Sequence, residues 1–172
     1  MPFLFQTTRL RCRRWIRSDF DALFAVYSDP VAMRWVGEGK PISHEGCEKW
    51  FEVTETNYAT RGYGMFALED RASGEVVGCC GLVHPGGQEE VEIKYSLLRS
   101  HWGAGLATEV VPALLQYGTT HHALSRILAT VDPDNLASQR VLAKAGAALR
   151  ERRIEEDGSV TLVFEWQRPG AA

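Results

Sequence analysis

Small residues recur at short spacing in one stretch of the chain, Trp102-Gly103-Ala104-Gly105-Leu106-Ala107-Thr108. The stretch lies between a predicted strand and the start of an amphipathic helix. Its small side chains allow backbone N–H groups to approach a ligand closely. The first turn of a helix also leaves its N–H groups unpaired and adds a partial positive charge, so the stretch could seat a pyrophosphate. A plain turn into a helix would have the same pattern, so this stretch does not decide between the two alone.

A second polar stretch, Asp132-Pro133-Asp134-Asn135-Leu136-Ala137-Ser138, follows the next predicted strand. Asn135 has the side chain of a helix N-cap, which is its simplest interpretation. Ser138 comes one turn into the same helix and aligns only approximately with the apolar Val141 and Leu142. Its hydroxyl could therefore point into a cleft.

The first half of the chain predicts elements that could carry these two stretches. A helix begins near Ser18 or Asp19 and ends at Asp29-Pro30, and a second helix is capped by Ser43. The strands expected in this half cover residues 8–12, 65–68, 76–83 and 91–97. In the last of them apolar residues occupy every second position, which predicts a half-buried strand with Glu92, Lys94 and Ser96 on the opposite face.

The second half predicts a helix, a strand, a short helix and a hairpin. Leu106, Val110, Val111, Leu114 and Leu115 form an apolar stripe, which Pro112 is expected to kink or to end early. The remaining elements are a strand over residues 126–131, a helix over 135–144 closed by Gly146, and two strands joined at Asp157-Gly158. This order predicts a mixed α/β domain around one sheet.

Composition excludes several classes of protein. The chain has 172 residues, 45% of them hydrophobic, which suits one domain with a core. A net charge of −3 argues against a nucleic-acid binder, and no apolar run is long enough for a signal peptide or a membrane span. We therefore expect a cytoplasmic protein. The four cysteines show no metal-ligand spacing and are expected to be free buried thiols.

Taken in order, the motifs resemble the two signature regions of the GNAT acetyltransferases, and most closely the RimJ/RimL-like protein N-terminal acetyltransferases. That branch has E-I-G-Y-x-L, then W-G-x-G-x-A-T-E, then N-x-x-S-x-x-V-L-x-K-x-G. The matching segments here are Glu92-Ile93-Lys94-Tyr95-Ser96-Leu97, Trp102 to Glu109, and Asn135, Ser138, Val141-Leu142, Lys144 and Gly146. The match covers about half of the chain, with weaker agreement near the start.

The resemblance implies one GNAT domain over residues 1–172 that binds acetyl-CoA as acetyl donor and needs no metal. Its sheet would be mostly antiparallel with one splayed parallel strand pair, about four helices and a C-terminal hairpin. The pantetheine arm would pair with backbone near Leu97 and bind Asn135. Residues implied in pyrophosphate binding are Trp102, Gly103, Ala104, Gly105, Ala107 and Thr108, chiefly through main-chain amides, because the wider family has Gln or Arg in place of Trp102.

The implied reaction is direct attack of an amine on the thioester. Ser138 is the candidate donor to the thiolate sulfur, because Leu142 stands where many members carry a protonating Tyr. Glu92 is the candidate base, directly or through water, with a solvated carboxylate beside Lys94 as the alternative. Glu89 and Glu90 are competitors for the same role. His84 and His101 could touch phosphate or substrate, although ordinary surface histidines would look the same.

The acceptor stays open between a protein N-terminus and a small molecule such as a polyamine, an aminoglycoside or an amino compound. An α-amine has a pKa near 8, so roughly a tenth is neutral at pH 7 and little base catalysis is needed, which weakly favours it over lysine. A non-catalytic acyl-CoA-binding module is the alternative function. A dinucleotide-binding oxidoreductase fits poorly, because its loop should follow the first strand. The protein could be a monomer or a homodimer.

Overall fold

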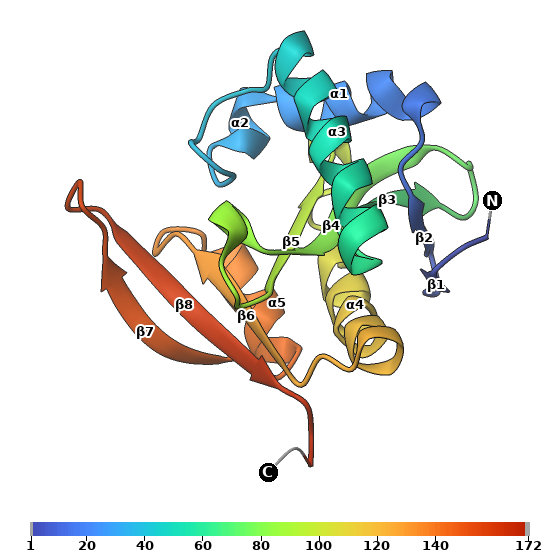
Figure 1. Ribbon diagram of the computed structural model, residues 1–172. Coiled ribbons are helices and arrows are strands. Elements are labelled where there is room, and N and C mark those ends of the chain that lie inside the picture. The colour runs from blue at the N-terminus through green and yellow to red at the C-terminus, as the bar shows by residue number, and fades with distance from the viewer. Residues whose placement is uncertain (1, 171–172) are drawn as a thin grey trace.

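The computed structural model describes residues 2–170, which form one mixed sheet with helices on both faces (Figure 1). The α-helices of this part are α1 (Phe20–Ser28), α2 (Pro30–Met33), α3 (His44–Arg61), α4 (Leu106–His122) and α5 (Leu136–Lys144). The strands are β1 (Phe5–Gln6), β2 (Leu10–Arg14), β3 (Met65–Asp70), β4 (Val76–Val83), β5 (Glu92–Leu97), β6 (Arg126–Val131), β7 (Ala148–Ile154) and β8 (Val160–Gln167). The predicted order of the larger elements is confirmed, whereas β1 and α2 were not predicted.

The sheet has the strand order β1-β2-β3-β4-β5-β6-β8-β7. Neighbouring strands are antiparallel except β5 and β6, which are parallel and register at a single pair, Glu92 with Leu128. These two strands therefore separate beyond that pair. The expected mostly antiparallel sheet with one splayed parallel pair is confirmed.

Local sequence signals set most of the helix ends. Ser43 caps α3 by accepting a hydrogen bond from the Gly46 amide, and Gly62 ends it with a positive φ of 81°. Asp29 and Pro30 end α1 as predicted, but the same pair also starts α2, where Asp29 is the N-cap and Pro30 the first helical residue. The prediction of about four helices missed this extra turn.

Pro112 does not end its helix, so of the two alternatives predicted for it, a kink or an early end, the early end is wrong. The α4 helix continues through Pro112 to His122. A proline inside a helix removes one N–H···O=C bond. Here the apolar face around it, including Val110, Val111 and Leu114, is fully buried, and this packing outweighs the local cost.

Two hydrophobic clusters, one on each face, hold the helices against the sheet. Helices α4 and α5 pack against one face, where Val91, Ile93 and Leu97 of the β5 region belong to the same cluster. Helices α1 to α3 cover the other face through a second cluster. By the alternation of a strand, Lys94 and Ser96 face the side of α1 to α3. Beside the place where β5 and β6 separate, β5 thus presents side chains to the helices on both faces of the sheet.

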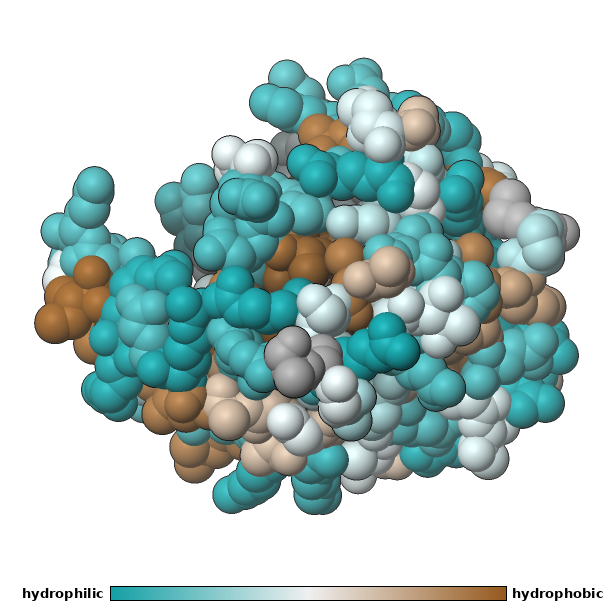
Figure 2. Space-filling model, turned by 60° about the horizontal axis from the view of Figure 1, so that its bottom comes forward, coloured by the Kyte–Doolittle hydropathy of each residue, from teal (hydrophilic) through white to brown (hydrophobic). Residues whose placement is uncertain are grey.

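The hairpin of β7 and β8 forms the end of the sheet and projects from the body at the left of Figures 1 and 2. Its turn contains Gly158, whose φ is 82°, as the Asp157-Gly158 signal predicts. The β7 side chains are all exposed. Hydrophilic residues cover most of the face shown in Figure 2.

The four cysteines are buried free thiols, as expected. The sulfurs of Cys12 and Cys80 lie 3.9 Å apart. Burial raises the pKa of the Cys79 thiol to about 12, so this group stays protonated at neutral pH. Among residues 2–170, no helix combines the length and the apolar character needed to cross a membrane.

Candidate active site

A cavity of about 1650 Å³ follows β5 and is lined from both layers of the protein. Ordinary small-molecule sites enclose about 300–1,000 Å³, so this volume suits two ligands or one large one. Predicted site residues on its wall are Leu97, Trp102, Gly103, Gly105, Ala107, Thr108, Asn135 and Ser138. Ala104 and Glu92, which were also predicted, are not on the wall. The tertiary structure therefore brings the stretch over residues 102–108 and the stretch over residues 132–138 to one cavity.

The loop before α4 leaves its backbone N–H groups accessible. Gly103 and Gly105 have φ values of 72° and 77°, and a Cβ added at Gly103 would meet no atom within 4 Å. Gly105 is the N-cap of α4 and has no side chain to bind the first amides of the helix. The first intrahelical bond runs from the Glu109 amide to Gly105, so the amides before it are open to a ligand. This is the geometry of an anion-binding helix N-terminus.

The turn between β1 and β2 anchors this loop. Arg9 donates from Nε to the Glu109 carboxylate at 2.8 Å and from Nη1 to the Ala104 carbonyl at 2.8 Å. Glu109 also accepts hydrogen bonds from the Thr7 hydroxyl and the Arg9 amide. Partial burial opposes ionisation of Glu109, but these bonds and the charge of Arg9 outweigh it and lower the pKa of the carboxyl. The negative charge of Glu109 beside the loop is thereby compensated by Arg9. Ala104 holds the loop rather than lining the cavity.

One edge of β5 is free to pair with a ligand. The Leu98 amide donates to Val77 of β4 at 2.8 Å. Antiparallel partners alternate between bonded and non-bonded pairs, so the backbone groups of Tyr95 and Leu97 point away from β4, toward the gap before β6. The Leu97 carbonyl accepts a bond from the indole N–H of Trp102 at 2.9 Å. The Trp102 side chain therefore fixes the loop to β5.

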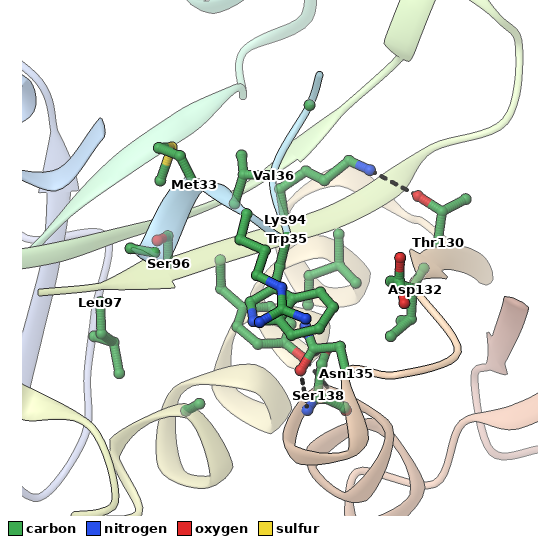
Figure 3. A pocket seen from close by; sticks show the side chains of 18 of the residues that line it. Met33, Trp35, Val36, Lys94, Ser96, Leu97, Thr130, Asp132, Asn135 and Ser138 are labelled. Atoms are coloured by element: carbon green, nitrogen blue, oxygen red, sulfur yellow. Dashed lines mark hydrogen bonds between the residues drawn. The ribbon is translucent and has the colours of Figure 1, made fainter. Parts of the chain in front are cut away.

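Ser138 meets a tyrosine across the cavity. Its Oγ lies 2.7 Å from the Tyr95 hydroxyl. Its amide donates to the Asn135 side chain at 3.2 Å (Figure 3). Asn135 is thus the N-cap of α5, as its simplest interpretation predicted. Burial raises the pKa of Tyr95, which keeps its hydroxyl protonated and able to donate to Ser138. In that arrangement the Ser138 hydrogen is available to a further acceptor.

Glu92 is buried, with 5% of its surface exposed, rather than solvated. Its carboxylate accepts hydrogen bonds from Lys94 Nζ at 2.7 Å, Gln88 Nε2 at 3.1 Å and Thr130 Oγ1 at 3.1 Å. Lys94 also donates to Thr130 at 2.9 Å (Figure 3), which links β5 to β6. Burial opposes ionisation, but the charge of Lys94 and the hydrogen bonds outweigh it and lower the pKa of Glu92. At neutral pH the network holds a carboxylate and an ammonium.

This lowered pKa predicts an acid-sensitive fold. A carboxyl group whose pKa is lower in the folded state stabilises the fold above its unfolded pKa, about 4.3, and loses that contribution as pH falls through the folded pKa. We expect the melting temperature to fall when the pH is lowered below about 4.3, and to fall less steeply in Glu92→Gln. Thermal unfolding followed by circular dichroism between pH 3 and 7 checks this. Parallel curves of melting temperature against pH for the original protein and Glu92→Gln would contradict it.

The competing site residues lie elsewhere. Glu89 and Glu90 are exposed and line a separate pocket of about 450 Å³ together with residues after α4. His84 borders both pockets, and its Nε2 lies 2.9 Å from the Tyr63 hydroxyl. His101 is on the cavity wall beside the loop, with its Nδ1 3.0 Å from the Ser100 hydroxyl.

Sequence reasoning overlooked the side chain of Tyr95. It treated Tyr95 as one apolar position of an alternating strand, and nothing local shows that its hydroxyl reaches α5. A signal was present, since a tyrosine at a buried strand position usually needs a hydrogen-bond partner. The pairing with Ser138 became visible only when β5 and α5 were placed side by side.

Comparison with known proteins agrees with this geometry. A family model described as "Acetyltransferase (GNAT) domain" matches residues 9–148. "Uncharacterized protein YkkB" of Bacillus subtilis (strain 168) is 33% identical over 143 residues, 81% of this chain and 82% of YkkB. "Uncharacterized N-acetyltransferase YoaA" of the same organism is 32% identical over 145 residues, 83% of this chain and 81% of YoaA.

Two solved structures resemble this fold closely. The acetyltransferase from Agrobacterium tumefaciens str. C58 superposes with a TM-score of 0.82 at 25% identity, over 98% of this chain and 95% of that one. RimL, described as a ribosomal L7/L12 alpha-N-protein acetyltransferase in complex with coenzyme A, has a TM-score of 0.81 at 19% identity, over 96% and 98%. At that identity RimL shares the fold alone, so the expected RimJ/RimL-like branch is not confirmed. The family match itself is decisive: the chain belongs to the GNAT family and is an N-acetyltransferase.

Proposed function

We propose that this protein transfers an acetyl group from acetyl-CoA directly to a primary α-amine. The observation that carries the proposal is that the open glycine loop, the free edge of β5 and the Ser138 hydroxyl all border one cavity. GNAT proteins use acyl-CoA, and the proposed donor is its acetyl form.

The described residues fit a coenzyme A of this kind. The space that a Cβ would occupy at Gly103 is open. The uncapped amides that begin α4 suit a pyrophosphate. The backbone groups of Tyr95 and the amide of Leu97, which pair with no neighbouring strand, suit an amide-containing arm lying along β5. The side-chain oxygen of Asn135 accepts a hydrogen bond from the Ser138 amide. Its NH₂ group is therefore the part that we propose donates to the pantetheine arm.

When bound, acetyl-CoA supplies a thioester whose carbonyl carbon the amine attacks. The new C–N bond forms as the C–S bond breaks, the electron pair goes to sulfur, the nitrogen loses one proton and the sulfur gains one. A backbone N–H of residues 95–97 is the proposed donor to the carbonyl oxygen. Ser138 is the proposed donor to the thiolate, with Tyr95 orienting its hydroxyl. This pair would do the work for which other family members use a tyrosine at the position of Leu142.

Glu92 remains a proposed base, but its geometry limits what it can contribute. Three hydrogen bonds occupy its carboxylate, which leaves about one lone-pair site for a water. The same bonds lower its pKa, which makes it a weak proton acceptor. An α-amine is already roughly a tenth neutral at pH 7, so a base could raise the rate by only about tenfold through deprotonation.

We therefore expect Glu92→Gln to lower kcat by less than about tenfold at pH 7 for an acceptor whose α-amine lies beside an amide, such as a peptide or an amino-acid amide. Steady-state rates at saturating acceptor would measure this. Glu90→Gln is the matched control, because Glu90 is an exposed carboxylate outside the main cavity. A loss of about a hundredfold or more would contradict the limit and would mark Glu92 as a strong general base.

The proposed function is tested by two measurements on the full chain. Calorimetric titration with coenzyme A reports binding at the loop, and release of free thiol from acetyl-CoA across a panel of amines reports transfer. Thiol release with an α-amine and formation of the acetylated product support the proposal. Binding without turnover on any amine would favour a non-catalytic acyl-CoA-binding module, and absence of heat with folded protein would reject the donor site.

A further inference from the structure

The charges on the acceptor side of the cavity are mostly positive. We call acceptor half the part of the wall formed by α1 to α3, the loop after α2, and the β5 face that carries Lys94 and Ser96. Its charged residues, among those the structure describes, are the cations Arg34, Lys40 and Lys94 and one carboxylate, Glu38. Glu92 is not part of the wall, but its carboxylate pairs with the Lys94 ammonium at 2.7 Å, so the excess positive charge rests on Arg34 and Lys40. This balance is unfavourable for a ligand with several positive charges.

Lys94 presents a positive charge to the cavity, which the Glu92 carboxylate at 2.7 Å partly offsets. Its ammonium is held by Glu92 and Thr130 and remains partly exposed, with 38% of the side chain accessible. A nearby positive charge disfavours the protonated form of an incoming amine and lowers its pKa. A single amine therefore reaches the site more easily as the neutral nucleophile. A second ammonium on the same acceptor would find two carboxylates on the cavity wall, Glu38 in the acceptor half and Asp132 after β6, against the charges of Arg34 and Lys40.

Arg34 is positioned to bind an anionic group. Its guanidinium lies over the Trp35 ring at 4.5 Å, and neither it nor Lys40 makes an ion pair within residues 2–170. A guanidinium stacked on an aromatic ring keeps its in-plane N–H groups available to a carboxylate. Trp35 and Arg34 both line the cavity that holds Ser138.

The rest of the acceptor half is mostly apolar and aromatic, with the polar residues Thr54, Asn57 and Ser96 among them. Trp50 packs against Tyr27 at 5.7 Å and edge-on against Trp15 at 5.8 Å, and all three rings are fixed by these contacts. Met33 and Val36 lie at the same wall (Figure 3). Such a surface suits an apolar side group on the acceptor.

We propose that the acceptor is a monoamine that carries a carboxylate near its amine and an apolar side group, as an apolar amino acid does, and that polyamines and aminoglycosides are poor acceptors. The inference rests on the proposed function and narrows it. The carboxylate faces Arg34 and Lys40, the side group lies on the aromatic wall, and the amine stands between Lys94 and the thioester.

Matched acceptor pairs test the role of the carboxylate. Phenylalanine, leucine and methionine are compared with their amides, and spermidine and kanamycin represent polycations. Because an amide lowers the pKa of the neighbouring amine, kcat/KM is expressed per concentration of neutral amine, from thiol release checked by mass spectrometry of the product. We expect each acid to exceed its amide by at least about tenfold, the effect of one charge-assisted hydrogen bond, and to exceed both polycations.

Variants connect the preference to the named residues. Arg34→Gln with Lys40→Gln should reduce the acid-to-amide ratio to near one, whereas Lys49→Gln, an exposed charge on α3 away from the cavity, should leave it unchanged. Amides that equal or exceed the acids, or turnover of spermidine or kanamycin above every acid, would overturn the inference while leaving acetyl transfer intact. Failure of coenzyme A to bind would instead reject the proposed function on which it rests.

Discussion

Replacing Gly103 with alanine is expected to weaken coenzyme A binding about 10- to 100-fold, the value of one hydrogen bond to a charged group. The added methyl group would meet no protein atom within 4 Å, so it would occupy the space assigned to the pyrophosphate. The φ of 72° adds backbone strain of about 1–2 kcal/mol in the variant. Calorimetric titration of both proteins with coenzyme A gives the two dissociation constants.

Gly74 provides a closely matched control for this experiment. It lies in the turn between β3 and β4, has a φ of 75°, and a Cβ there would also meet nothing within 4 Å. Gly74→Ala therefore introduces the same backbone strain at a position outside the loop before α4. It should lower the melting temperature about as much as Gly103→Ala while binding coenzyme A like the original protein. Equal affinities in all three proteins would show that the pyrophosphate does not sit at this loop.

Removing the Ser138 hydroxyl is expected to lower kcat about a hundredfold, at the low end of what a positioned proton donor contributes. The KM for acetyl-CoA should change little, because the Ser138 contact strengthens only as negative charge develops on sulfur. Ser138→Thr keeps a hydroxyl and should retain more activity than Ser138→Ala. Initial rates of thiol release over a range of acetyl-CoA concentrations separate kcat from KM. If Ser138→Ala retained full turnover, the proposed role would be wrong.

Tyr95→Phe tests how the serine is oriented. Without the Tyr95 hydroxyl, Ser138 is free to donate to a carbonyl of its own helix, a common alternative for serine. We infer that Tyr95 is a positioning residue, and its loss should lower kcat less than Ser138→Ala does, without raising KM. Tyr117→Phe is the control, because the Tyr117 hydroxyl pairs with His122 outside the cavity. Equal losses in the two tyrosine variants would point to a general effect of hydroxyl removal on stability.

Much of the architecture was accessible from local patterns. The alternation of residues 91–97 predicted β5, and Asp157-Gly158 predicted the hairpin of β7 and β8. The glycine loop was placed correctly before α4, because small residues and an apolar stripe are both local features. The early end, one of the two alternatives at Pro112, did not occur, since burial of the surrounding helix face overrode a local preference.

The environment of the candidate site was less accessible. Glu92 and Lys94 are two residues apart, so their pairing could be anticipated, but the hydrogen bond from Thr130 to Glu92 comes from β6, 38 residues along the chain. The same limit applies to Ala104, whose carbonyl is taken by Arg9 from a distant turn. A side chain's pKa and its exposure depend on such neighbours, and sequence separation does not reveal them.

By itself, the order of residues determined the family, the strand and helix types, and which loop can expose amides to an anion, because these depend on neighbours within a few positions along the chain. The tertiary structure decided which groups meet: Tyr95 with Ser138, Arg9 with Glu109, and Lys94 with Thr130. Those contacts join elements that are far apart in sequence, and their distances follow only from how helices and strands pack around the shared core.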